Sequence, residues 1–76
     1  MDTYLKELSY LLELKKDFVE SIRSRIPNGM TFYDIAELSG LNIHTIERFF
    51  SGTNVTFKTA AKILVAIDLY KMNKNV

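Results

Sequence analysis

The sequence contains no cysteine and no tryptophan, and only one proline, one histidine and three glycines among its 76 residues. Without cysteine the chain forms neither disulfides nor thiolate metal sites, and one histidine supplies too few ligands for a zinc site. No apolar run approaches the roughly 18 residues of a membrane span, and residues 1–4 lack the basic start of a signal peptide. We therefore expect a cytoplasmic protein that uses no metal or cofactor.

Charge is distributed unevenly along the chain, although its formal total is only +1. Residues 1–20 carry five acidic and three basic side chains, whereas residues 21–76 carry four acidic and seven basic ones. This asymmetry indicates that only the later part faces a polyanion such as a nucleic acid. The sequence shows neither a glycine-rich phosphate loop nor paired carboxylates in an apolar setting, so we do not expect an enzyme.

The beginning of the sequence predicts helix over residues 3–26. Apolar side chains recur there at steps of three and four, and Pro-Asn-Gly at residues 27–29 ends the pattern. Asp17 and Glu20 match a capping box, so the pattern leaves open whether the segment is one helix or two.

Residues 1–16 are apolar around most of the helix circumference, although a helix on a monomer surface needs only one apolar stripe. Two interpretations remain open. The segment packs back over its own domain, or it forms a homodimer through Leu5, Leu8 and Leu12.

Three shorter helices are expected after residue 30. Thr31 and Asp34 match a capping box at the start of the first, and Gly40 suits its left-handed end. Asn42 is expected to cap the second helix, which runs to about residue 51, with an inward face of Ile46, Phe49 and Phe50.

Thr56 is expected to cap the last helix, over residues 57–70, and residues 71–76 are expected to fray. The other positions expected to face the core are Val19, Ile22, Ile26, Ile35, Ala36, Leu38, Phe57, Ala60, Ile63, Leu64 and Ile67.

The two expected helices around Gly40 are joined by so short a turn that they must cross at a large angle, as in a helix-turn-helix. The first half of the second helix then protrudes, with His44 and Arg48 on one face because they are four residues apart. Such a helix fits the major groove of DNA, where these side chains can donate to base edges and phosphates.

The string "TFYDIAELSGLNIHTIER", residues 31–48, resembles the headpiece of Lac-repressor-type proteins, within the lambda-repressor-like helix-turn-helix superfamily that includes Cro-type regulators. "VTFKT", residues 55–59, resembles the cap of that family's third helix, and the resemblance extends over residues 31–70. It implies sequence-specific binding of double-stranded DNA.

By position, the resemblance implies that bases are read by Ile43, His44 and Arg48. It implies that phosphates are bound by Tyr33, Asn42, Thr45, Ser51, Thr56 and Thr59, with Lys58 adding charge. Four residues depart from the pattern. Asn42 replaces the usual serine cap and keeps its chemistry, whereas the other three departures change the chemistry. Ile43 makes no hydrogen bond, Phe32 replaces a glutamine that clamps phosphate in Cro-type relatives, and Glu47 adds a negative charge to the DNA face unless it pairs with Arg48 or accepts from a cytosine amine.

We therefore predict a compact, all-α, lambda-repressor-like domain of four to five helices, with a helix-turn-helix and an extended N-terminal helix. Residues 1–16 form that helical extension, residues 17–70 the DNA-binding core and residues 71–76 a tail. The predicted function is transcriptional regulation, as a nucleoid-associated homodimeric Cro- or repressor-type protein of phage, plasmid or bacterial origin that binds operator DNA. The alternative is a protein-interaction module that acts as an antirepressor or modulator by binding a partner repressor.

Overall fold

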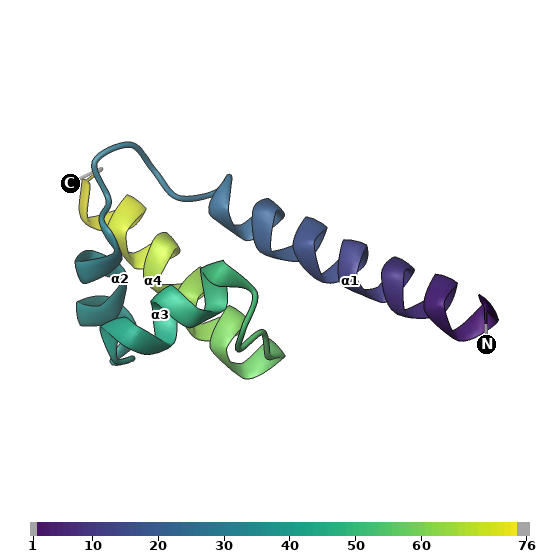
Figure 1. Ribbon diagram of the computed structural model, residues 1–76. Coiled ribbons are helices and arrows are strands. Elements are labelled where there is room, and N and C mark those ends of the chain that lie inside the picture. Colours follow the sequence, from purple (N-terminus) through teal and green to yellow (C-terminus); the bar gives the residue numbers. More distant parts are fainter. Residues whose placement is uncertain (1, 75–76) are drawn as a thin grey trace.

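The computed structural model describes residues 2–74, with side chains from residue 13 to residue 73. It consists of four α-helices and contains no strand in this described part: α1 (Asp2–Arg23), α2 (Phe32–Ser39), α3 (Ile43–Ser51) and α4 (Phe57–Lys74) (Figure 1). The expected all-α class is confirmed. Over residues 2–74, the structure has no helix with both the length and the apolar character needed to cross a membrane.

The N-terminal segment is a single helix, so the capping pattern at Asp17 does not divide it. Its end comes earlier than residue 26, the expected position, because the chain tightens after Arg23. The amides of Arg25 and Ile26 donate to carbonyls three residues back, at 3.0 and 3.1 Å. This tightening precedes Pro27, whose ring disfavours helical backbone at Ile26.

The expected caps of α2 are present. Thr31 Oγ1 accepts from the Asp34 amide at 3.2 Å, and Asp34 Oδ2 accepts from the Thr31 amide at 2.8 Å. Gly40 ends the helix in the left-handed region, at φ 74°, and its amide donates to the Ala36 carbonyl at 3.0 Å. A side chain would be strained at this φ, which explains the glycine.

The last helix begins as expected, where Thr56 Oγ1 accepts from the Thr59 amide at 3.2 Å. It continues to Lys74, so the prediction that residues 71–74 fray is wrong. These residues include no glycine or proline, and Lys71 complements the negative end of the helix dipole. The last two residues of the predicted tail lie outside the described part.

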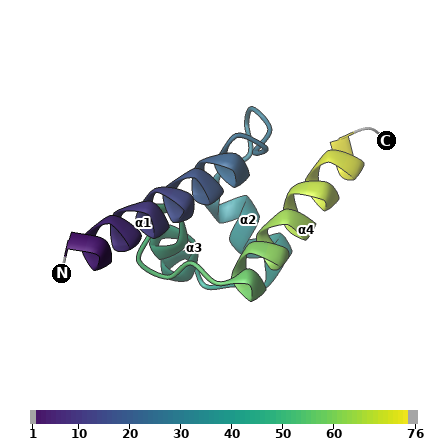
Figure 2. The same cartoon turned by 90° about the vertical axis from the view of Figure 1, so that its right-hand side faces the viewer.

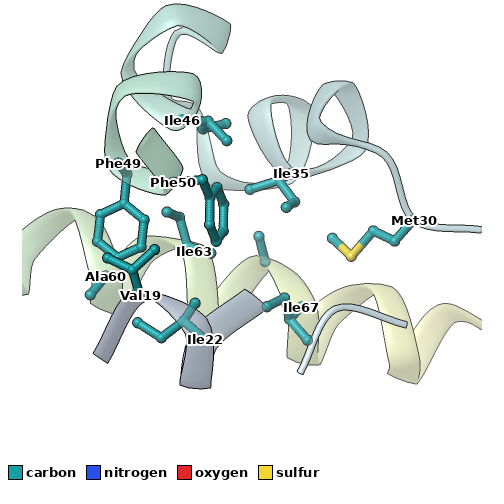
Figure 3. Packing of buried hydrophobic residues seen from close by; sticks show 11 residues of the cluster. Val19, Ile22, Met30, Ile35, Ile46, Phe49, Phe50, Ala60, Ile63 and Ile67 are labelled. Atoms are coloured by element: carbon teal, nitrogen blue, oxygen red, sulfur yellow. The ribbon is translucent and has the colours of Figure 1, made fainter. Parts of the chain in front are cut away.

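The core lies where α1, α3 and α4 meet, with α2 closing one side (Figure 3). Its buried apolar side chains are Val19, Ile22, Met30, Ile35, Ile46, Phe49, Phe50, Ala60, Ile63, Ala66 and Ile67. Met30 and Ala66 were not predicted. Phe57 was expected in the core but is 85% exposed. It stands at the first position of α4, where its ring makes a T-shaped contact with Phe18 at a centroid distance of 5.9 Å and most of its surface faces solvent.

The molecule is elongated because α1 continues past the other helices (Figure 1). It measures 55 × 21 × 18 Å, and its radius of gyration of 14.5 Å exceeds the value of about 11 Å expected for a compact chain of this length. α1 contacts α3, and α2 contacts both α3 and α4; a view turned by 90° shows α3 alongside α1 (Figure 2). The side chains of Leu5, Leu8 and Leu12, assigned to a dimer interface, lie outside those described.

Arg23 ties the end of α1 to the end of α3. Its Nη2 donates to the Phe50 carbonyl at 3.0 Å, and its guanidinium carbon lies 5.1 Å from the centre of the Phe50 ring. The last carbonyls of a helix have no partner within the helix, and a cation there is favoured by the helix dipole. Arg23 thus joins two elements that are 27 residues apart in the sequence.

We expect Arg23→Ala to lower the free energy of unfolding by about 1–2 kcal/mol, because the Phe50 carbonyl loses its donor and the ring its cation. Urea denaturation followed by circular dichroism measures the change. Arg25→Ala is the matched control, since Arg25 is exposed and makes no ion pair or side-chain hydrogen bond with the described side chains. Equal losses in the two variants would contradict this role of Arg23.

Candidate nucleic-acid interface

α3 divides cleanly into a buried and an exposed face. Ile46 and Phe49 are 0% exposed and Phe50 is 6% exposed, and all three face the core (Figure 3). The exposed side chains of the helix are His44, Glu47, Arg48 and Ser51. Because these residues are three and four apart, they form one stripe along the solvent side of α3. We call them the α3 stripe.

The ends of α3 are held by hydrogen bonds that fix the stripe in place. Asn42 Oδ1 accepts from the His44 amide at 2.8 Å, as the sequence predicted. At the other end Gly52 adopts a left-handed φ of 86° and its amide donates to the Phe49 carbonyl at 3.1 Å. With Arg23 bound to the Phe50 carbonyl, the stripe is carried by a helix that is restrained at both ends.

Two charged residues of the stripe lie beside each other. His44 Nδ1 is 3.7 Å from Glu47 Oε2, with 76% and 56% of the two side chains exposed. The pair is an ion pair only when the imidazole is protonated, and an exposed pair of this kind contributes little to stability. Its importance is in placing the Glu47 carboxylate next to His44 and not next to Arg48.

Arg48 is the free cation of the stripe. Its side chain is exposed and forms no ion pair or hydrogen bond with any side chain that the structure describes. Glu47 and Glu37 are the two intramolecular partners that the sequence offers for Arg48, and neither pairing is observed. All five N–H donors of the guanidinium are available to an external acceptor.

The hydroxyl residues assigned to phosphate differ in accessibility. Tyr33, in the first turn of α2, is 74% exposed. Ser51 is exposed, but its Oγ already donates to the Arg48 carbonyl at 2.9 Å and lies 3.0 Å from Thr53 Oγ1. Thr45, like the base-reading candidate Ile43, is half-buried.

Thr59 lies inside the protein. It is 8% exposed, and its hydroxyl accepts from the Thr56 hydroxyl at 3.0 Å. Thr56 and Lys58 remain exposed at the start of α4. The Thr59 hydroxyl is therefore part of the internal hydrogen bonding at this end of α4, and we leave it out of the candidate surface.

The α3 stripe has the character of a contact surface and not of an enclosed site. Two hollows of about 350 Å³ are each lined partly by α1, and neither includes His44 or Arg48. Among the described residues no three His, Asp or Glu side chains lie close enough together to hold a metal ion. With one arginine, one histidine and one glutamate, the stripe can offer and accept hydrogen bonds but carries little net charge.

The supporting role of Arg23 was not predicted. Its hydrogen bond and ring contact both depend on the position of Phe50 in another helix, and no local pattern marks such a pair. A similar limit applies to Phe32, which stacks on Phe50 at a centroid distance of 4.9 Å and an angle of 10°. Its ring completes the packing around α3 at the position where the resembled family binds phosphate.

We expect Asn42→Ala to destabilise the protein by about 1 kcal/mol and to loosen the first turn of α3, because the His44 amide loses its acceptor. Thermal denaturation measures the first effect and hydrogen exchange of the His44 amide the second. Asn42→Ser preserves a capping oxygen and serves as the control. The cap has no such importance if both variants match the unsubstituted protein in stability and exchange.

Comparison with known proteins returns no protein-family model, no curated protein and no solved structure that matches this chain. The resemblance of residues 31–70 to lambda-repressor-like domains therefore stays a prediction. The function has to be argued from the side chains that the fold exposes.

Proposed function

We propose that this chain is a sequence-specific, double-stranded-DNA-binding transcriptional regulator of the Cro or repressor type, with α2 and α3 as its helix-turn-helix. The observation that carries the proposal is the α3 stripe, a row of polar side chains on a rigid helix whose opposite face is buried. An α-helix fits the major groove, where donors and acceptors on its exposed face meet the base edges.

In this proposal Arg48 and His44 read bases. The Arg48 guanidinium, which pairs with none of the described side chains, suits the two acceptors of guanine, and an imidazole can donate to the same edge. Ile43 is half-buried at the start of α3, where its exposed atoms can pack against a thymine methyl group. The Asn42 amide nitrogen remains available to phosphate while its oxygen caps α3.

Contacts to the DNA backbone come from three helices: Tyr33 at the start of α2, Ser51 at the end of α3, and Thr56 with Lys58 at the start of α4. Only one of these side chains is positively charged. Phosphate neutralisation supplies most of the affinity of DNA-binding proteins and makes that affinity salt-dependent. One copy of the chain therefore has weak electrostatic binding, and two half-sites are needed for useful affinity.

The proposal accordingly includes a homodimer built on the N-terminal half of α1. That half extends beyond the other helices (Figure 1), and Leu5, Leu8 and Leu12 recur along it at helical spacing. A two-fold dimer presents its two α3 helices to half-sites about one turn of DNA apart, roughly 34 Å.

The alternative is a protein-interaction module that binds a partner repressor as an antirepressor or modulator. One observation favours it: the Glu47 carboxylate stands on the α3 stripe beside His44, which lowers the attraction of this face for phosphate. A protein surface accepts such a mixed face more readily than DNA does.

Selection of bound duplexes from a random DNA pool tests the proposal and returns the half-site. On the selected duplex we expect Arg48→Ala and His44→Ala each to weaken binding by roughly tenfold or more, since a well-placed base contact discriminates by about 1–3 kcal/mol. Gel shifts at low salt measure the loss, with Lys71→Ala, an exposed cation on α4, as the control.

Circular dichroism shows whether each variant keeps its fold. If the unsubstituted protein selects no sequence at low salt, DNA recognition by α3 is wrong. If it instead binds a larger regulator and Arg48→Ala abolishes that complex, the alternative is correct.

A further inference from the structure

A second surface, between α1 and the start of α4, has no role in the base contacts proposed above. It is a hollow of about 350 Å³ lined by Leu14, Lys15, Phe18, Val55, Thr56 and Phe57. We call it the α1–α4 groove. Leu14 is 46% exposed and Phe57 is 85% exposed, so two large apolar side chains of the groove lie in water. Large apolar side chains gathered in one exposed patch mark interaction sites.

The backbone of α1 indicates what fills this groove. From Asp2 to about residue 13, over about 18 Å, α1 continues past the body of the molecule (Figure 1). The sequence places Tyr4, Leu8 and Leu11 along this half at steps of four and three, and the same series continues to Leu14 and Phe18. One apolar series thus runs along α1 from its free half into the groove.

We propose that a second copy of this chain fills the groove, with the two α1 helices antiparallel and crossing near Leu11. In that arrangement Phe18 of one copy comes level with Tyr4 of the other, and Leu14 with Leu8, because each pair is equally far from Leu11. Both grooves are filled at once by the same contact, which gives a closed two-fold dimer.

Charge favours this occupant and this direction. Among the acidic residues in the first half of α1, Glu7 is the one whose position on the helix lies beside the Tyr4–Leu8–Leu11 series, whereas Lys15 lines the groove and Lys58 follows Phe57 on α4. In the antiparallel arrangement Glu7 comes level with Lys15. In a parallel pair, each acidic residue would instead lie beside the same acidic residue of the other chain, and both grooves would stay open.

This inference deepens the homodimer of the proposed function and rests on it, but not on DNA recognition by α3. It keeps Leu8 in the contact and replaces Leu5 and Leu12 by the series of Tyr4, Leu11, Leu14 and Phe18. If the chain dimerises but selects no DNA sequence, the proposed function as a DNA-binding regulator is wrong and the groove assignment still holds. If the chain is a monomer that binds DNA through Arg48, DNA recognition by α3 is supported and the groove assignment is wrong. Sedimentation of the full chain without DNA therefore separates the two.

The first test replaces Phe57, whose exposure makes it dispensable for the core. We expect Phe57→Glu to raise the dimer dissociation constant by about tenfold or more, because it removes a ring that the second copy covers in the proposed dimer and adds a charge to the contact. Met72→Glu is the matched control, since Met72 is also a large apolar residue of α4, 64% exposed but at the other end of the helix. Equal dissociation constants for the two variants would overturn the groove assignment.

The second test uses the absence of cysteine, which makes each introduced thiol unique. Leu11→Cys is expected to form a disulfide-linked dimer under mild oxidation, because the two copies meet there. Mixed Leu8→Cys and Leu14→Cys chains are expected to cross-link to each other in preference to themselves. Val65→Cys, exposed on α4, is the control and stays monomeric on a denaturing gel.

If Leu8→Cys chains cross-link to each other in preference to Leu14→Cys chains, the antiparallel arrangement is wrong. A chain that sediments as a monomer at every concentration, with no cross-link at Leu11→Cys, would overturn the proposal as a whole. Capture of another protein by the groove in that case would assign it to a different partner.

Discussion

The structure depends on the burial of one face of α3. Ile46, Phe49 and Phe50 are three and four residues apart, so burying them sets the rotation of the helix about its own axis and thereby decides which residues face solvent. Phe50 is the centre of this packing, because Phe32 stacks on its ring and Arg23 binds both its ring and its carbonyl. The α3 stripe is exposed as a consequence of how α1, α2 and α4 enclose the opposite face.

α1 has two parts with different functions in the fold. Its C-terminal half supplies Val19 and Ile22 to a core that a chain of this length can barely complete, while its N-terminal half extends beyond that core (Figure 1). The two proposed surfaces follow from this division. The α3 stripe belongs to the closed part of the molecule, and the α1–α4 groove forms where α1 leaves it. Of the residues assigned to DNA, only Thr56 also lines the groove, so the proposed dimer would leave the stripe free.

Most helix boundaries could be predicted because they are decided by neighbouring residues. The capping box at Thr31, the left-handed Gly40 and the Asn42 and Thr56 caps each involve residues no more than four positions apart. Predictions failed where exposure depends on distant elements. Phe57 continues the apolar pattern of α4 but is 85% exposed at the start of that helix, where it contacts the ring of Phe18. Thr59 fits a family position yet is buried.

The sequence by itself determined a helical N-terminal segment, which it left as one helix or two, and the three helices after residue 30 in their order. It also determined most of the caps and the polar composition of the segment after Gly40, because these follow from local hydrogen bonds and helical periodicity. The tertiary structure alone decided that Arg48 pairs with none of the described side chains, that Glu47 lies beside His44, and that Arg23 holds the end of α3. It also decided that a groove opens beside Phe57. The reason is physical: each of these features depends on the placement of side chains that only the packing of separate helices brings together or keeps apart.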